Sequence, residues 1–196
     1  MREDVILRRL DEALLPALLE AAVAGADPVE VMPPVPGPPG WTAERRAAFL
    51  GFHRSRSRGL AAAPVETTYA VLVGGRVVGA ARLCPEPPGP VPQGAAPGSG
   101  GPGPTASGAV EAGVWLGRSA RGAGVGRAVL GGLVAEARAA GFAELVAHTT
   151  PDNTGARRLL EGCGARTSVT ARGVAARVGL REVGTHPTPG AEPGTG

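Results

Sequence analysis

The stretch from Glu111 to Gly141 reads EAGVWLGRSARGAGVGRAVLGGLVAEARAAG and has the pattern of a strand, a glycine-rich loop and a helix. A strand is predicted over Ala109–Leu116, where small and branched apolar residues dominate. A helix is predicted over Gly124–Ala140, because apolar residues recur there at helical spacing and a glycine follows. The loop between them should present backbone N–H groups at a helix start, which suits a phosphate group.

The loop itself, Arg121–Gly126, reads RGAGVG, and Arg121 and Arg127 add full positive charges near it. A turn in a glycine-rich protein would look similar, so other phosphate-binding patterns need testing. The dinucleotide pattern GxGxxG fails, because counting from Gly122 places Arg127 at its last position. A Walker loop requires lysine, which this sequence lacks. Nucleotide binding is therefore disfavoured.

Before the loop, the sequence predicts three strands and two helices. The second and third strands should form a hairpin, because Gly74 and Gly75 separate two apolar runs. The first helix begins after Asp11 as a cap, and the proline-rich segment Gly25–Gly40 should hold little regular structure. The predicted elements are a strand over Val5–Leu10, a helix over Glu12–Ala24, a helix from Thr42 to Arg58, and strands over Thr67–Val73 and Arg76–Leu83.

After the loop helix, we predict a strand, a short helix and two further strands. Asp152 or Asn153 should cap the short helix, which ends near Gly162. The three strands are predicted over Phe142–Thr149, Ala165–Ala171 and Ala175–Val183.

Composition indicates one globular domain over residues 1–183. The chain has 196 residues, of which 43% are hydrophobic, with a flexible Pro/Gly-rich insertion at about 85–108 and a disordered tail at 184–196. The net charge of +3 and an aromatic content of 3% argue against a nucleic-acid partner. No apolar run is long enough for a membrane span, and the N-terminus does not resemble an export leader. The two cysteines and three histidines lack metal-ligand spacing. We therefore expect a cytoplasmic protein with no metal and no membrane partner.

Two motifs carry a resemblance to the GNAT family of N-acetyltransferases, in particular its ribosomal-protein-acetyltransferase-like branch. The family's acetyl-CoA loop, Arg/Gln-x-x-Gly-x-Gly/Ala, is matched by Arg121, Gly124 and Gly126. The family's second motif is matched downstream by PDNTGARRLLEGCGA, through Asn153, Ala156, Leu159, Glu161 and Gly164. The resemblance extends over most of residues 5–183.

The resemblance implies an α/β (α+β) fold with a mixed, mostly antiparallel sheet of about seven strands, flanked by about four helices. The sheet would be splayed between its fourth and fifth strands. The implied activity is transfer of an acetyl group from acetyl-CoA to a primary amine of a small molecule or a protein N-terminus, by direct attack in a ternary complex. The implied partners are acetyl-CoA and the amine acceptor, and the resemblance leaves a homodimer open.

The resemblance also assigns roles to residues of this chain. The backbone of Val114, Trp115 and Leu116 would align the thioester, with the Leu116 N–H as the oxyanion donor. Asn153 would touch the cofactor arm as well as capping its helix. The pyrophosphate would be held by the loop residues Arg121, Gly122, Ala123, Gly124, Val125, Gly126 and Arg127.

The catalytic groups are less evident. Glu111 is the candidate base, since many family members carry an acid on this strand; a solvent-facing charge would explain it equally well. His148 is a second candidate. Leu160 stands where the family often has an acid tyrosine, and Tyr69, the only tyrosine, belongs to an earlier strand. This departure supports an alternative function, an acyl-CoA-binding sensor or regulatory module without turnover.

The second helix carries many basic residues, and in this family it borders the acceptor. They would either receive an acidic acceptor or form a solvated helix face, which we consider the better interpretation. These residues are Arg45, Arg46, His53, Arg54, Arg56 and Arg58.

Overall fold

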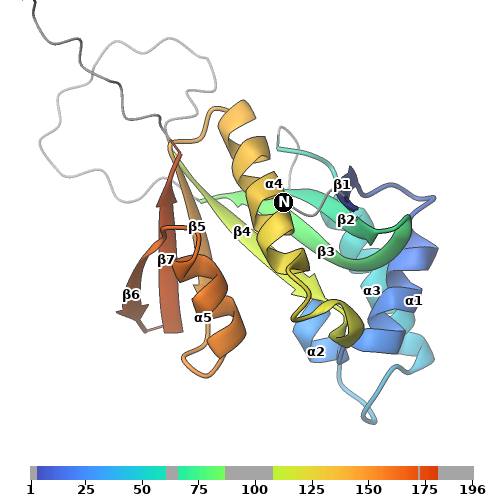
Figure 1. The fold of residues 1–196 in the computed structure, drawn as a ribbon. Helices are drawn as coiled ribbons and strands as arrows, with labels where there is room; N and C mark the ends of the chain where they lie inside the picture. Colours follow the sequence, from blue (N-terminus) through green and yellow to red (C-terminus); the bar gives the residue numbers. More distant parts are fainter. Residues whose placement is uncertain (1–3, 61–65, 87–107, 172, 181–196) are drawn as a thin grey trace, which may run out of the picture.

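A seven-stranded sheet forms the centre of the computed structural model, which describes residues 4–60, 66–86, 108–171 and 173–180 (Figure 1). All neighbouring strands pair antiparallel except β4 and β5, which are parallel. The mixed, mostly antiparallel sheet predicted from the sequence is thus confirmed. In spatial order the strands are β1 (Val5–Arg9), β2 (Thr67–Val73), β3 (Arg76–Pro85), β4 (Ala109–Leu116), β5 (Glu144–Thr149), β7 (Gly173–Gly179) and β6 (Arg166–Thr170).

The sheet opens between β4 and β5, as expected. Their pairing runs only from Ala109 opposite Glu144 to Ala112 opposite Ala147. Beyond Ala112, β4 continues to Leu116 along β3, while β5 continues along β7. The last four residues of β4 therefore have β3 on one side and no β5 partner on the other.

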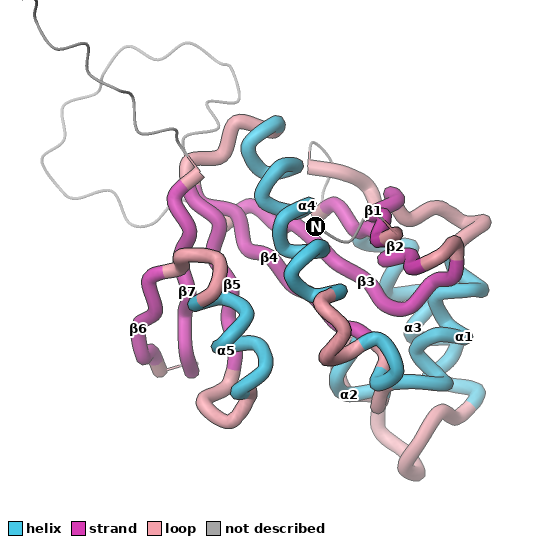
Figure 2. The backbone as a smooth tube through the Cα atoms, viewed as in Figure 1, coloured by secondary structure: helices cyan, strands magenta, loops and turns pink. Residues whose placement is uncertain are grey.

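Helices cover both faces of the sheet (Figure 2). On one face α4 and α5 pack against apolar residues such as Val110, Leu133 and Leu145. On the other face α1 and α3 pack around Leu18 and Phe49. Every one of these five side chains is shielded from solvent, so each face has its own core. The helices are α1 (Leu15–Gly25), α2 (Pro28–Val31), α3 (Ala43–Arg56), α4 (Val125–Ala139) and α5 (Thr154–Glu161), with a 3₁₀ turn at Arg118–Ala120.

Local signals predicted several boundaries correctly. Gly74 and Gly75 have φ of 55° and 80°, as the predicted hairpin turn requires. The Thr42 hydroxyl accepts the Arg45 N–H at 3.3 Å and caps α3. Of the two residues proposed to cap α5, Asn153 is the cap, because its side chain accepts the Ala156 N–H at 3.0 Å.

Two details near the N-terminus differ from the prediction. The segment expected to hold little regular structure contains the short helix α2, and the described residues hold five α-helices, consistent with the expected number of about four. Pro28 occupies the first position of this helix, where its missing N–H costs nothing, and the Glu30 carboxylate accepts the Asp27 N–H at 3.4 Å. Asp11 caps a turn before α1 by accepting the Leu14 N–H at 2.9 Å, so the helix itself begins later than predicted.

The C-terminal strands differ slightly from the prediction. β5 begins at Glu144, two residues late, and β6 spans Arg166–Thr170. β7 begins at Gly173, two residues early. The end of the last predicted strand, most of the insertion at 85–108 and the tail at 184–196 lie outside the described residues.

Candidate active site

The open end of β4 exposes backbone polar groups between the diverging strands. The Gly117 N–H donates to the Val78 carbonyl at 2.8 Å. Because the backbone groups of successive residues point alternately to the two sides of a strand, the odd-numbered residues of β4 form the hydrogen bonds with β3. The N–H and C=O groups of Val114 and Leu116 therefore point toward β5, which no longer pairs there. The Leu116 carbonyl accepts from Arg121, and an extended ligand arm could bond the other groups of this edge, as a further strand would.

The glycine-rich loop follows immediately and lies on the surface. Gly122 and Gly124 have φ of 78° and 79°, values that side chains disfavour, and Gly124 is the N-cap of α4. Gly126 lies against α5, since a Cβ there would approach Leu159 Cδ2 to 3.2 Å. Glycines thus shape a cradle at the start of a long helix, where N–H groups lack intrahelical partners.

Arg121 is engaged by protein groups in this structure. Its Nε donates to the Leu116 carbonyl at 2.8 Å, and its Nη2 donates to the Glu30 carboxylate at 3.1 Å. A parallel ion pair joins Arg118 to Asp27 at 3.0 Å. The loop is therefore tied to the α2 region, and Arg121 must leave Glu30 to serve a phosphate with its full charge.

The remaining predicted cofactor residues surround this loop. Ala123 and Arg127 are exposed, whereas Val125 is buried and anchors the start of α4 in the core. Asn153 is exposed at the start of α5, where it acts as a cap. The described residues thus bring the two sequence motifs together beside the opening of the sheet, as Gly126 packing on Leu159 indicates.

Neither Leu160 nor Tyr69 offers an acid at this opening. Leu160 belongs to α5 and is buried in the core that α4 and α5 form with the sheet. The Tyr69 hydroxyl donates to Glu136 Oε2 at 3.0 Å, and burial, reinforced by that carboxylate, raises the pKa of Tyr69 to about 12. The only tyrosine is therefore structural.

On the opposite face of the sheet lies a cleft of about 540 Å³. Residues of α2, α3 and the strands β2 to β4 line it, and it reaches the opening through Ala112, Val114 and His148. Both candidate bases, Glu111 and His148, line this cleft. His148 lies 4.0 Å from the Glu86 carboxylate.

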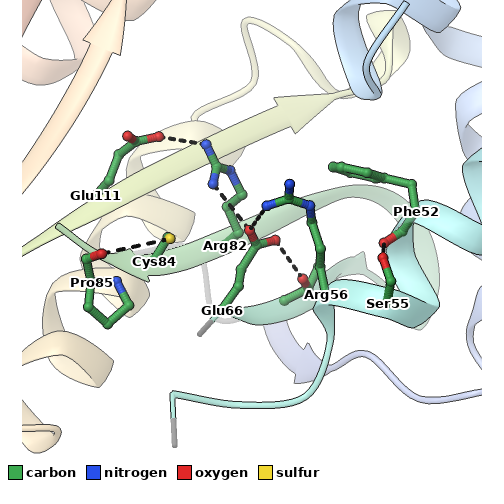
Figure 3. A network of polar contacts seen from close by, with 9 residues as sticks. Phe52, Ser55, Arg56, Glu66, Arg82, Cys84, Pro85 and Glu111 are labelled. Carbon is green, nitrogen blue, oxygen red and sulfur yellow. Dashed lines mark hydrogen bonds and ion pairs between the residues drawn. The ribbon is translucent and has the colours of Figure 1, made fainter. Parts of the chain in front are cut away.

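Four charged side chains form a network in the cleft (Figure 3). Arg82 joins two carboxylates, donating to Glu66 Oε2 at 3.3 Å and to Glu111 Oε1 at 2.5 Å. Arg56 Nη1 also donates to Glu66 Oε2, at 3.4 Å. Glu111 is thus neither a simple solvent-facing charge nor a free base; it is held by a guanidinium beside the cleft.

Sequence analysis did not identify Glu66 or Arg82. An arginine within the otherwise apolar run RVVGAARL was a usable signal, because a charge on a central strand needs a partner. Glu66 carried no such signal, since it precedes a strand as many solvated residues do.

Most of the basic run on α3 does not reach the cleft. Arg45 donates to the carbonyls of Val35, Gly37, Pro38 and Gly40 and so holds the proline-rich loop. Arg46 donates to the Trp41 carbonyl, Arg54 pairs with Glu12, and Arg58 is exposed beyond the helix end. Only His53 and Arg56 of this run line the cleft.

His53 is the buried member of the run, with 4% of its surface exposed. Its ring packs edge-on against Phe49 and Phe52, and burial lowers the pKa of His53 to about 4. It is therefore neutral at physiological pH. Among the described residues, neither His53 Nε2 nor Trp115 Nε1 has a hydrogen-bond partner, and both residues line the cleft.

Within residues 4–60, 66–86, 108–171 and 173–180, no group of three or more acidic, histidine or cysteine side chains is arranged to hold a metal ion. No helix in the same part of the chain has the length and apolarity to cross a bilayer.

Comparison with solved structures shows the same fold in several acetyltransferases. RimJ of Mycobacterium smegmatis, in complex with CoA-disulfide, has a TM-score of 0.67 and 19% identity over 92% of this chain and 84% of its own. YncA of Salmonella typhimurium, with its cofactor acetyl-CoA, has a TM-score of 0.58 and 19% identity, covering 96% and 99%. RimL, a ribosomal L7/L12 α-N-protein acetyltransferase, has a TM-score of 0.57 and 14% identity, covering 91% and 94%. At 14–19% identity, these likenesses show the fold that this chain has in common with the three proteins.

Comparison by sequence leads to the same group of proteins, the acetyltransferases. No protein with a curated description matches it. The model of the acetyltransferase (GNAT) family, however, matches residues 34–165, which is more than half of the chain and includes both motifs. The chain therefore belongs to the GNAT acetyltransferase family.

Proposed function

We propose that this protein transfers an acetyl group from acetyl-CoA to a primary amine by direct attack in a ternary complex. The acceptor would be a small molecule or a protein N-terminus. The observation that carries the proposal is the arrangement of β4. One part of this strand offers backbone groups that β5 does not pair, and another part carries an acidic side chain. The edge at Val114 and Leu116 opens beside the glycine loop, while Glu111 lies in the cleft behind.

The free edge suits the cofactor. RimJ and YncA are solved with CoA-disulfide and acetyl-CoA, and this chain shares their fold. The loop at Arg121–Gly126 with Arg127 would hold the pyrophosphate through backbone N–H groups, and Asn153 would lie beside the cofactor arm. The Leu116 N–H would donate to the thioester oxygen as it gains negative charge, which is where a fixed backbone donor helps most.

Glu111 would act on the amine. The acceptor arrives as an ammonium ion, which must lose a proton before its nitrogen can attack. Glu111 accepts that proton, the nitrogen forms a bond to the thioester carbon, and the carbon–sulfur bond breaks. The bonded nitrogen, which is positively charged, releases its second proton to water as the amide forms. The sulfur leaves as a thiolate and takes a proton from water, which is feasible because a free thiol has a pKa of about 8.5.

Thermal unfolding with acetyl-CoA tests the first step. We expect acetyl-CoA to raise the melting temperature, because a ligand that binds only the folded state stabilises it. Free-thiol release is then measured against a panel of small amines and peptides with free N-termini. Glu111→Gln should lower kcat by about 10²-fold or more, the usual contribution of a general base.

Glu12→Gln is the matched control, since Glu12 also pairs with an arginine, at 3.0 Å, but lies outside the cleft lining. Acetyl-CoA binding without thiol release from any amine would favour the non-catalytic sensor, which is supported by Leu160 standing where the family often has tyrosine. No thermal shift would contradict both functions. Equal rates for Glu111→Gln and the wild type would exclude Glu111 as the base.

A further inference from the structure

The cleft contains a pair of arginines held in place by a buried carboxylate. Glu66 is only 1% exposed, and its Oε2 accepts from both Arg56 and Arg82, at 3.4 and 3.3 Å. Its Oε1 accepts the Thr68 hydroxyl at 3.3 Å. A buried carboxylate with three donors is satisfied and costly to move, so it fixes two guanidinium groups side by side (Figure 3).

These two guanidinium groups retain donors for a ligand. Each has five N–H groups, whereas Arg56 donates only through Nη1 to the described residues and Arg82 only through Nη1 and Nη2. Both side chains line the cleft and are more than a third exposed. Arg56 also lies over the Phe52 ring, 5.1 Å from its centre, which restricts its position. A planar anion such as a carboxylate matches this geometry.

Glu111 lies on the other side of the same Arg82 guanidinium. The network therefore contains two positive and two negative groups and is balanced. If Glu111 turns to an incoming ammonium, Arg82 Nη2 loses its partner. A carboxylate on the same acceptor would replace Glu111 at Arg82 and use the free donors of Arg56. A zwitterion keeps the charges balanced, whereas a simple amine leaves an excess positive charge.

The spacing restricts the acceptor further. Arg82 and Glu111 are in direct contact, at 2.5 Å. An acceptor whose carboxylate replaces Glu111 at Arg82, and whose ammonium binds Glu111 itself, must therefore carry its carboxylate and ammonium only a few bonds apart. An α-amino acid has this spacing, while a diamine has no carboxylate and a protein N-terminus has an amide there.

The lining and the size of the cleft also agree. Apolar side chains of α2, α3 and the adjoining loop, namely Val29, Val31, Met32 and Phe52, form the rest of the lining. A volume of about 540 Å³ lies in the range of small-molecule sites.

We infer that the acceptor is a free α-amino acid with an apolar side chain, whose carboxylate binds Arg56 and Arg82 and whose amine is presented to Glu111. This inference rests on the proposed acetyl transfer and specifies its substrate class.

The test compares matched acceptors in the thiol-release assay. L-leucine, L-methionine and L-phenylalanine are each measured against the corresponding amide and the amine that lacks the carboxylate. We expect at least one amino acid to exceed both of its counterparts in kcat/KM by about tenfold or more, the usual worth of a charged hydrogen bond.

Variants of Arg56 assign that preference. Arg56→Gln should raise KM for the amino acid by about tenfold or more, and should lower kcat/KM for the amino acid several-fold more than for the matched amine. Arg56→Lys, which keeps the charge but not the planar fork, should lie in between. Arg54→Gln is the control on the same helix, because Arg54 pairs with Glu12 outside the cleft.

The outcomes separate the two proposals. Equal rates for amino acid, amide and amine, or an unchanged KM in Arg56→Gln, would overturn the inference and leave acetyl transfer intact. If no amine or peptide releases thiol, acetyl transfer fails. Calorimetry with the protein saturated with CoA then decides: amino-acid binding weakened by Arg56→Gln supports the carboxylate site, and no binding rejects it.

Discussion

Replacing His53 with leucine should remove a large part of the protein's sensitivity to acid. His53 is 4% exposed, and burial lowers its pKa to about 4, from 6.5 in an unfolded chain. Between these two values the unfolded chain binds a proton that the folded protein does not. The stability that depends on a neutral His53 is therefore complete above about pH 6.5 and is lost as the pH falls toward 4.

The magnitude follows from that interval. At about 1.4 kcal/mol per pH unit, the full loss is about 3 kcal/mol, reached below pH 4. At pH 5 the loss is already about 2 kcal/mol, and at pH 7.5 it is close to zero. Leucine has a similar volume and no proton to gain, so His53→Leu should lack this component.

Urea unfolding at pH 7.5 and pH 5, followed by tryptophan fluorescence, measures the effect. Between the two conditions the wild type should lose about 2 kcal/mol more unfolding free energy than His53→Leu. Comparing each protein with itself removes any packing change that leucine introduces. Phe49→Leu is the control: it disturbs the same aromatic cluster without removing a titratable group, and should retain the wild-type pH dependence. Equal losses in the wild type and His53→Leu would refute the reasoning.

Three further predictions concern the loop and the tyrosine. Gly124→Ala should destabilise the protein by about 1–2 kcal/mol and weaken acetyl-CoA binding, because the φ of 79° at this position is strained for alanine. Gly131→Ala is the control: this glycine is exposed within a helix with open space around it, so alanine should instead raise the melting temperature. Glu30→Gln should tighten CoA binding in calorimetry by up to about fivefold, because it removes an exposed ion pair in which Glu30 competes with the cofactor for Arg121. Weaker binding would show instead that the ion pair preorganises the loop. Tyr69→Phe should cost about 1 kcal/mol in urea unfolding and leave thiol release unchanged, because its hydroxyl bonds the Glu136 carboxylate of α4, outside the cleft lining. Slower release would contradict its structural role.

Sequence predicted the parts of the site that depend on local backbone preference. Gly124 had to be glycine for a left-handed N-cap, and Asn153 could be identified as a cap from the residues beside it. The strand over Ala109–Leu116 has the same bounds in the structure, because its apolar pattern is local. Such features involve residues within a few positions of one another, and their energetics can be judged without knowing the fold.

Contacts between distant segments were not predictable in this way. Arg121 pairs with Glu30, 91 residues earlier, and this pair holds the loop against a helix that the sequence did not predict. The motif marked Arg121, but not the partner that occupies it in this structure.

The sequence by itself determined the family motifs, the order of most elements and the presence of an acid on β4. Only the tertiary structure decided what surrounds that acid. Glu111 contacts Arg82, Arg82 contacts Glu66, and Glu66 also contacts Arg56; these three residues come from two other strand regions and a helix. Ion pairs form wherever folding brings charges together, and no local pattern encodes them. The glycine-rich loop could therefore be predicted from the sequence, and the charged cleft could not.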